Sequence, residues 1–399
     1  MSNKFTLRWC DTVEDIDPQD WTAIYGADII KSREFFKANE AAGFEEVEFH
    51  YLQVFRDKII VSIVPCFSYR MDLLNIATSP SAKKWMVWIR KIFPSFLKLR
   101  AFVTGSYAAT CEHFIEYSPS LTPAEVKEVS EIIGGEIKKR SRLTKSSFVF
   151  VKDVKERGLQ YVKEILTSDY RFFVSFPTTA IPVIKEAPYP QGLRKKNRKR
   201  YRNFKARFDE SFRWEIWQDF SGDKAVQFYG LYQAVLDKAK NKFEFLNAKF
   251  FDNISTMMGD RSFLLVARDK ESGEIRVMEL VLEHEDKLIP LYLGIRYKED
   301  DTKVLYLNTI FRTVKEAENR GKSFVDLGQT SYYPKTMSGA LVENIYYGFW
   351  SGKPVIKWMI ENVFDKVFNE PSVPAHVYLD DYVEAAHSVL EEKGFVLIN

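Results

Sequence analysis

The strongest constraint on the fold is a pair of β-type runs that occurs twice along the chain. Val47–Phe55 and Ile59–Phe67 flank one turn, Ser262–Arg268 and Ile275–His284 flank another, and the tripeptide Arg-Asp-Lys stands at both turns. Runs of this length that are rich in Val, Ile and Phe and bounded by charged turns predict β-hairpins. Leu288–Ile295 (LIPLYLGI) extends the second hairpin to a three-strand meander. Antiparallel sheets are therefore expected in both halves.

The elements around the two hairpins follow the same order. A helical pattern precedes each hairpin, at 19–42 and at 223–240. A helix and then a strand follow each one, at 121–140 and 146–154 in the first half and at 303–321 and 323–328 in the second. This order indicates an internal duplication. The sequence predicts an α/β (α+β) protein with two tandem domains, each a mixed, mostly antiparallel sheet flanked by helices.

The domain boundary is expected near a proline-rich stretch that contains Pro177, Pro182, Pro188 and Pro190. We place the domains at 1–155 and 156–399. The two Arg-Asp-Lys copies lie 212 residues apart, whereas the related motifs SSFVFV and KSFVDL lie 176 apart. The first copy therefore carries 36 extra residues, which we place in an aromatic loop near Trp85–Phe102.

The charge of the chain is concentrated in one segment. Nine of the fourteen residues from Arg194 to Arg207 are Lys or Arg, and without them the formal charge of +3 becomes −6. Such local basicity argues against extended binding of DNA. Leu193, Tyr201, Phe204 and Phe208 recur at helical spacing, so residues 193–208 are expected to form a basic amphipathic helix. The Lys and Arg side chains of this helix have two interpretations. They form either a solvated helix face or a binding site for an anion. That anion would be a donor phosphate, a tRNA acceptor end or acidic lipid headgroups.

Several broad classes are not indicated. The three cysteines form no paired motif, and the N-terminal residues do not resemble a signal peptide. No apolar run approaches the ~18 residues of a membrane-spanning helix. We therefore expect a cytoplasmic protein without an integral membrane segment. The five histidines have no metal-ligand spacing, and no metal is predicted.

Four features together resemble a known superfamily. They are the basic helix, the meander that ends in LYLGI, the helix that ends in AENRG, and the strand FVDLG followed by QTSYYPKTMSG. The sequence is similar to the GNAT superfamily of acyl-CoA N-acyltransferases, in the tandem Fem-like branch related to peptidoglycan-bridge aminoacyltransferases. One departure is the segment IRYKEDDTKVLYL, which lacks the Q/R-x-x-G-x-G/A loop that holds the CoA pyrophosphate in many GNAT proteins.

The resemblance implies an activity. A primary amine would attack the carbonyl of an acyl-CoA or acyl-carrier thioester directly, so the expected co-substrate is the thioester and no bound cofactor is needed. The second domain is expected to hold the chemistry. Two alternatives stay open at this point. One is a Fem-type aminoacyltransferase that takes its acyl group from aminoacyl-tRNA, and the other is a non-catalytic binding protein with the same fold.

The resemblance also implies catalytic residues. Asp326, in FVDLG, would orient the acceptor ammonium or accept its proton. Tyr333 would return a proton to the leaving group, and Lys335 would stabilise an oxyanion or bind a substrate anion. The structural alternative for Asp326 is hydrogen bonding to amides at a strand end. For Tyr333 and Lys335 it is an ordinary surface loop.

The strand alternation adds a further acid. Glu279 shares one face of its strand with Val277 and Val281, so it is either a buried general base with a raised pKa or a cross-strand partner of Arg276 or Lys287. Donor binding is assigned to basic residues of the 193–208 helix and to the end of the meander, namely Arg194, Lys195, Arg198, Tyr292 and Gly294.

A last amphipathic segment, KPVIKWMIENVFDKVF (353–368), has the composition of a helix that lies on a membrane surface. Its acids Glu361 and Asp365 weaken that interpretation.

Overall fold

The computed structural model describes residues 4–76, 79–96, 98–108, 112–165, 169–239, 242, 244–298, 301–367 and 377–398. These residues form two compact units, each assembled from several segments of the chain. The first unit comprises Met1–Phe176, Lys240–Leu246 and Ile345–Pro371. The second unit comprises Pro177–Ala239, Asn247–Asn344 and Ser372–Asn399.

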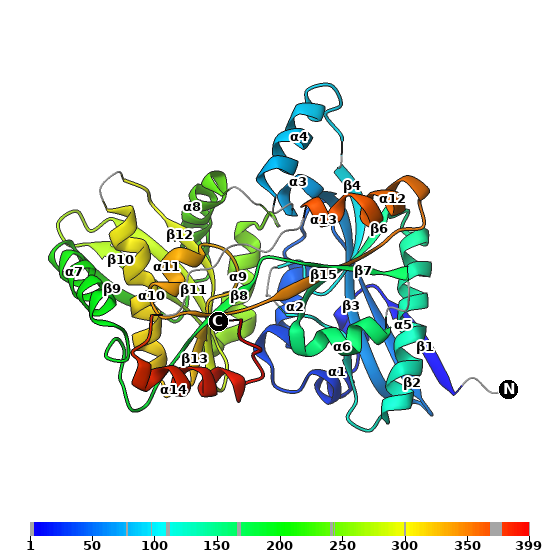
Figure 1. The fold of residues 1–399 in the computed structure, drawn as a ribbon, viewed down its shortest axis with the longest axis horizontal. Coiled ribbons are helices and arrows are strands. Elements are labelled where there is room, and N and C mark those ends of the chain that lie inside the picture. Colours follow the sequence, from blue (N-terminus) through cyan, green and yellow to red (C-terminus); the bar gives the residue numbers. More distant parts are fainter. Residues whose placement is uncertain are drawn as a thin grey trace. The chain divides into compact units, whose positions relative to one another are not determined.

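The sheet of the first unit has the strand order β1-β2-β3-β4-β6-β15-β7 (Figure 1), with the short β5 paired to β3. Only β4 and β6 are parallel among the described strand pairs of this sheet. The strands are β1 (Phe5–Cys10), β2 (Glu48–Arg56), β3 (Ile59–Asp72), β4 (Lys98–Thr104), β5 (Glu116–Tyr117), β6 (Phe148–Lys155), β7 (Arg171–Val174) and β15 (Ile345–Trp350).

Local sequence signals explain the helices of this unit. The longest, α5 (Pro123–Leu143), begins with a reciprocal capping box between Thr122 and Glu125, with proline in its first turn. Its buried face packs on the sheet through Val129, Ile133 and Ile137. The other helices are α1 (Pro18–Tyr25), α2 (Arg33–Ala41), α3 (Leu73–Ile76), α4 (Pro80–Arg90), α6 (Glu156–Ile165), α12 (Pro354–Asn362) and α13 (Phe364–Val367), with 3-10 turns at Val13–Asp15 and Ile29–Lys31.

The sheet of the second unit has the order β14-β8-β13-β12-β11-β10-β9. Its one described parallel pair is β12 with β13, at the position that β4 and β6 occupy in the first sheet. The strands are β8 (Thr178–Pro182), β9 (Phe212–Trp217), β10 (Ser262–Asp269), β11 (Ile275–Glu283), β12 (Lys287–Ile295), β13 (Phe324–Asp326) and β14 (Leu341–Glu343).

Helices cover both faces of this sheet. On one face, Ile310 and Val314 of α10 (Thr302–Asn319) pack against Val281 and Val325. On the other face lie α8 (Asp223–Lys238) and α9 (Ala248–Met258), whose aromatic side chains surround Tyr292. The remaining elements are α7 (Lys195–Ser211), α11 (Tyr332–Thr336), α14 (Asp380–Glu391) and the 3-10 turn Gly259–Arg261.

The two units repeat one topology. In each, two helices separate an edge strand, β1 or β9, from a hairpin, a further strand follows, and a long helix leads to the strand that pairs in parallel with it. The prediction of tandem α/β domains with mixed, mostly antiparallel sheets is therefore confirmed. In the described residues no helix is both long and apolar enough to cross a membrane.

The division of the chain differs from the continuous boundary expected at residue 155. The strand that follows β7 along the chain, β8, lies in the second sheet, and the strand that follows β14, β15, lies in the first. β15 pairs with β6 on one side and β7 on the other, and its Phe349 ring stacks on Phe150 at a centroid distance of 4.9 Å. This pairing holds residues 345–367 in the first unit because β15 completes that sheet.

The extra residues of the first copy are not a loop. Between β3 and β4 the chain forms α3 and α4, whereas β11 and β12 are joined by a short turn. The expectation of an aromatic loop across Trp85–Phe102 is wrong, because the apolar residues of that stretch form α4 at one end and β4 at the other.

Candidate active site in the second unit

The parallel strands β12 and β13 diverge soon after they pair. They are in register only at Lys287 with Phe324 and Leu288 with Val325. Beyond Asp326 the chain follows β8 instead, since the amide of Leu327 donates to the carbonyl of Thr179 at 2.9 Å. In the described part of the unit, no strand pairs with this edge of β12 after Leu288. The backbone donors and acceptors on this edge of β12 are therefore not used by a neighbouring strand within the described residues.

A β-bulge lies in the same stretch of β12. Leu280 of β11 faces Tyr292 whereas Val281 faces Pro290, so Leu291 has no partner opposite it on β11. Pro290 and Leu291 are half-buried in a strand that is otherwise mostly buried. A bulge of this kind bends the strand and turns local groups out of the ladder.

Glu279 lies one strand in from this edge, opposite Leu293 of β12. Only 6% of its surface is exposed, and its Oε2 accepts a hydrogen bond of 2.5 Å from the Thr313 hydroxyl of α10. Burial raises the pKa of the Glu279 carboxyl to about 8, although the hydrogen bond from Thr313 and the charge of Lys335 lower it. A carboxyl with this pKa gains and loses a proton near neutral pH, as a general base must.

The two cross-strand partners considered for Glu279 are engaged elsewhere. Arg276 pairs with Asp301, with 2.8 Å between its Nη2 and the carboxylate. Lys287 lies 3.8 Å from Asp326. Glu279 is therefore a buried carboxyl that pairs with neither of these two cations, and its role as a general base stays a prediction.

Lys335 of α11 is buried and points into the loop after β13. Its ammonium donates to three successive carbonyls, those of Leu327 at 2.7 Å, Gly328 at 3.1 Å and Gln329 at 2.7 Å. Three bonds equal the donor capacity of an ammonium group. Lys335 thus holds the backbone at the end of β13 and places a positive charge close enough to Glu279 to lower its pKa.

The same loop contains strained backbone. Thr330 and Ser331 both adopt positive φ, at 63° and 53°. Non-glycine residues in this region cost free energy and occur where the surrounding structure enforces them. On α10, the pKa of Tyr306 is raised to about 12, chiefly by burial and also by the charge of Glu279, while a hydrogen bond with Ser331 lowers it.

Asp326 ends β13 and is buried. Its Oδ1 accepts a hydrogen bond from the amide of Gly328 at 3.3 Å, and its Oδ2 faces the Lys287 ammonium at 3.8 Å. These contacts agree with the structural alternative of an acid that binds a strand-end amide. Its catalytic role stays a prediction.

Tyr333 lies on the surface, with 57% of its area exposed, and Arg200 of α7 stacks over its ring at 5.4 Å. The start of α7 is fixed to α11 because the Asn197 amide donates to the carbonyl of Met337 at 2.8 Å. The structure therefore brings the basic helix and the 332–336 segment together. Tyr333 is therefore an exposed residue beside α7, and its catalytic role stays a prediction.

The predicted basic helix is confirmed as α7, and two of its predicted donor ligands contact backbone. Arg194 donates to the carbonyl of Tyr378 at 3.0 Å, and Arg198 to those of Gln191 at 3.0 Å and Leu193 at 2.9 Å. Lys195 is exposed. The roles of these three residues in donor binding stay predictions.

Tyr292 and Gly294 lie on the α8–α9 face of the sheet, opposite to Glu279. The Tyr292 ring packs in the aromatic cluster of Tyr232, Phe250 and Phe251. A Cβ on Gly294 would lie 2.6 Å from the Cβ of Leu231 on α8, so the glycine permits close helix packing. Packing explains both positions, and their part in donor binding stays a prediction.

Three residues that contribute to this site were missed in the sequence. Thr313 and Tyr306 flank Glu279 from α10, and Arg200 stacks on Tyr333. A signal existed for Thr313, because Thr309 and Thr313 lie one helical turn apart among apolar residues. Nothing in the sequence showed that this turn faces Glu279, 34 residues earlier.

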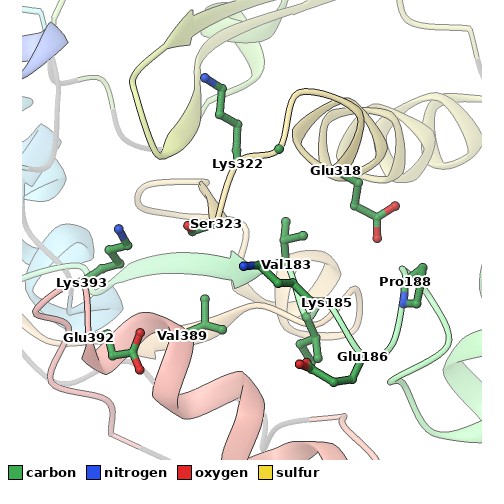
Figure 2. A pocket seen from close by; sticks show the side chains of 12 residues that line it. Val183, Lys185, Glu186, Pro188, Glu318, Lys322, Ser323, Val389, Glu392 and Lys393 are labelled. Carbon is green, nitrogen blue, oxygen red and sulfur yellow. The ribbon is translucent and has the colours of Figure 1, made fainter.

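A cavity of about 550 Å³ lies elsewhere in the second unit, beyond the end of β8 and between α10 and α14. Figure 2 shows side chains of both signs around it, including Lys185, Lys322 and Lys393 with Glu186 and Glu392. It adjoins the start of β13 at Ser323, whereas Glu279 is level with Leu293, at the far part of β12. The candidate active site and this cavity are therefore separate.

Comparisons with family models and with curated protein sequences give no match. Among solved structures the chain is similar to FemX, with a TM-score of 0.54 and 11% identity over 89% of this chain and 100% of that one. It is also similar to a tandem GNAT protein from the clavulanic acid biosynthesis pathway, with a TM-score of 0.50 and 9% identity over 88% and 99% of the two chains.

These similarities establish the fold. The chain has the tandem GNAT fold that FemX and the clavulanic-acid-pathway protein share, and the resemblance noted in the sequence is confirmed at that level. In this chain, the candidate site lies beside the divergence of β12 from β13.

Proposed function

We propose that this protein is an N-acyltransferase that moves an acyl group from an acyl-CoA or acyl-carrier thioester to a primary amine. The observation that carries the proposal is the buried Glu279 carboxyl, with its pKa raised to about 8, one strand from the open edge of β12. An extended thioester donor would pair with that edge, and the amine would approach the carbonyl beside the carboxylate.

The proposed reaction needs one proton acceptor and one proton donor. The amine nitrogen attacks the thioester carbonyl, a C–N bond forms, and a proton of that nitrogen passes to the Glu279 carboxylate. The C–S bond then breaks, and the departing thiolate takes a proton. Tyr306 is the proposed donor of that proton, because it is a neutral phenol near Glu279 whose pKa is about 12. Lys335 acts as a positioning residue.

The test measures CoA release from acetyl-CoA and palmitoyl-CoA with a panel of primary amines. For the wild type we expect kcat/KM to rise as pH increases through about 8, because the carboxylate is the active form. Glu279→Gln should lower kcat by a factor of about 100 or more and remove this pH dependence.

Glu316→Gln is the matched control. Glu316 is also a buried acid, but it pairs with Arg312 of α10 and with Arg320 just after that helix, so its loss should affect stability and leave the pH profile in place. A Glu279→Gln variant that keeps wild-type turnover with the same profile would remove the basis of the proposal.

A second candidate donor is aminoacyl-tRNA, and it is favoured by the surface of α7. Several exposed cations on this helix have no acidic partner within the described residues, namely Lys195, Lys196, Lys199, Arg202 and Arg207. A positively charged helix face of this length suits a phosphate backbone. Thermal shift measured with CoA, acyl-CoAs and bulk tRNA separates the donors, because only a ligand of the folded state raises Tm. If none of these ligands raises Tm, the alternative of a non-catalytic binding protein gains support.

A further inference from the structure

A group of large apolar side chains is exposed to solvent on the first unit. They belong to α4, the turn after it, and α12, and most of them are more than half exposed: Trp85, Trp88, Ile92, Phe93, Val355 and Trp358. Isolated exposed apolar residues are common, but several Trp and Phe side chains gathered on neighbouring elements mark an interaction surface.

The strand register places these elements at one end of the first sheet. Asp72, the last residue of β3, pairs with Lys98, the first residue of β4. Val149 of β6 pairs with Phe102 of β4 and with Trp350, the last residue of β15. The chain after Asp72 and the chain after Trp350 therefore leave the sheet at the same end. α13 contacts both α4 and α12 there, and Figure 1 shows α4 extending beyond the sheet.

The exposed apolar side chains of α4 are spaced so that they lie on one face of the helix. Trp85, Trp88 and Ile92 follow one another at intervals of three and four residues, so they share one face of the helix. Met86 is buried, and it anchors the opposite face to the unit. An amphipathic helix in a globular unit normally turns its apolar stripe inward, whereas α4 turns its two tryptophans to solvent.

Cations surround this apolar face. Lys84, Lys91 and Lys98 are exposed on α4, on the turn and at the start of β4. At the same end of the sheet, a cavity of about 380 Å³ is lined by Arg142, Lys145 and Lys353, and a second, of about 330 Å³, by Arg70, Lys98 and Arg100.

The acids at this end of the unit are fewer than the cations and are largely paired. Asp72 forms an ion pair with Arg90, Glu48 with Arg100, and Glu361 with Lys357 at 3.9 Å. Glu45, Glu46 and Asp365 are further acids at this end. The surface therefore combines exposed aromatic groups with excess positive charge.

We propose that this end of the first unit, comprising α4, the 91–96 turn and α12, binds the surface of an anionic lipid bilayer. Tryptophan favours the membrane–water interface because its ring is apolar and its indole N–H is polar. Trp85, Trp88 and Phe93 enter the interface, while Lys84 and Lys91 and the two cationic cavities meet lipid phosphates. The proposal does not depend on the proposed acyl transfer.

Two features favour a bilayer over a protein partner or a second copy of the chain. Lysine is depleted at the centres of protein interfaces, yet here Lys84 adjoins Trp85 and Lys91 lies two residues from Phe93. α4 also projects from the unit (Figure 1), and a projecting helix suits insertion into a fluid surface without a matching concave partner.

The experiment is flotation of the full-length protein with two kinds of vesicle, phosphatidylcholine alone and phosphatidylcholine mixed with phosphatidylglycerol. Binding is expected to the anionic vesicles and should weaken as salt is added. Trp85→Ala with Trp88→Ala should reduce the partition coefficient by a factor of about ten or more. Lys84→Gln with Lys91→Gln should reduce it roughly thirtyfold, from about 1 kcal/mol for each cation.

The matched control is Ile59→Ala with Lys127→Gln. Ile59 is 65% exposed at the opposite end of the same sheet, and Lys127 is exposed near the start of α5. This variant should bind like the wild type, and circular dichroism checks that all variants are folded. Equal binding by the tryptophan variant and the control would overturn the proposal. So would absent vesicle binding together with a dimer, seen by analytical ultracentrifugation, that Trp88→Ala dissociates.

Discussion

At the scale of single residues, Glu279 links stability to pH. Burial raises its pKa from 4.5 in the unfolded chain to about 8 in the folded one, so the folded state holds a proton that the unfolded state releases. Its contribution to the free energy of unfolding is therefore greatest below pH 4.5 and falls as pH rises towards 8.

Replacing this carboxyl with an amide should remove the loss of stability that accompanies rising pH. We expect Glu279→Gln to match the wild type at about pH 5 and to exceed it by a few kcal/mol at about pH 9. Urea unfolding of both proteins between about pH 5 and about pH 9 measures the difference in their free energies of unfolding. The other titrating groups are the same in both proteins, so their contributions cancel in this difference. A constant difference between the two proteins at every pH would mean that Glu279 ionises normally.

Lys335 allows a separate test of the charge near Glu279. Burial, the Thr313 hydrogen bond and the Lys335 charge together set the pKa of Glu279, and Lys335 is a lowering influence. Lys335→Met should therefore move the pH–rate profile to more alkaline pH, and Lys335→Arg should keep it. Three carbonyls would also lose a buried donor, so a stability loss of about 3 kcal/mol or more is expected from thermal unfolding. An unmoved profile in folded Lys335→Met would contradict this coupling.

At the scale of elements, the packing of α8 on β12 depends on a missing side chain. A Cβ at position 294 would meet the Leu231 Cβ at 2.6 Å and the backbone nitrogen of Tyr232 at 2.9 Å. Gly294→Ala should push α8 outward and destabilise the protein by about 1–3 kcal/mol.

Gly230→Ala, on the same helix, is the matched control for this prediction. Gly230 is exposed, and a Cβ at this position would meet nothing within 4 Å, so alanine there should stabilise α8 by about 0.5–1 kcal/mol. Urea midpoints of the two variants should thus shift in opposite directions. A neutral Gly294→Ala would show that the helix and strand can separate at little cost.

At the scale of the whole molecule, the formal charge is only +3, but the basic residues are concentrated on α7. If α7 binds a phosphate backbone, Lys196→Gln, Lys199→Gln and Arg202→Gln together should weaken retention of bulk tRNA in filter binding. The salt dependence should also fall, by roughly 0.7–0.9 in logarithmic slope for each phosphate that the variant no longer neutralises. Lys58→Gln, Lys127→Gln and Lys139→Gln provide a charge-matched control on the first unit. Equal slopes for the two triple variants would exclude α7 as the tRNA-binding surface.

The sequence by itself determined the repeated hairpins and most of the helices and strands around them, although it missed α3 and α4. Hairpins, helices and the internal repeat follow from side-chain periods of 2.0 and 3.6 and from local caps such as Thr122 with Glu125, which depend only on neighbours in the chain. Glu279 could be singled out in the same way, as an acid between Val277 and Val281 on one strand face.

Only the tertiary structure decided which distant segments meet. It placed β15 between β6 and β7, brought Thr313 to Glu279, directed Lys335 to the carbonyls after β13, and gathered α4 and α12 at one end of a sheet. The physical reason is that strand partners and buried contacts are chosen by packing free energy summed over the whole core. A local pattern shows that a residue is buried, but not which residue buries it.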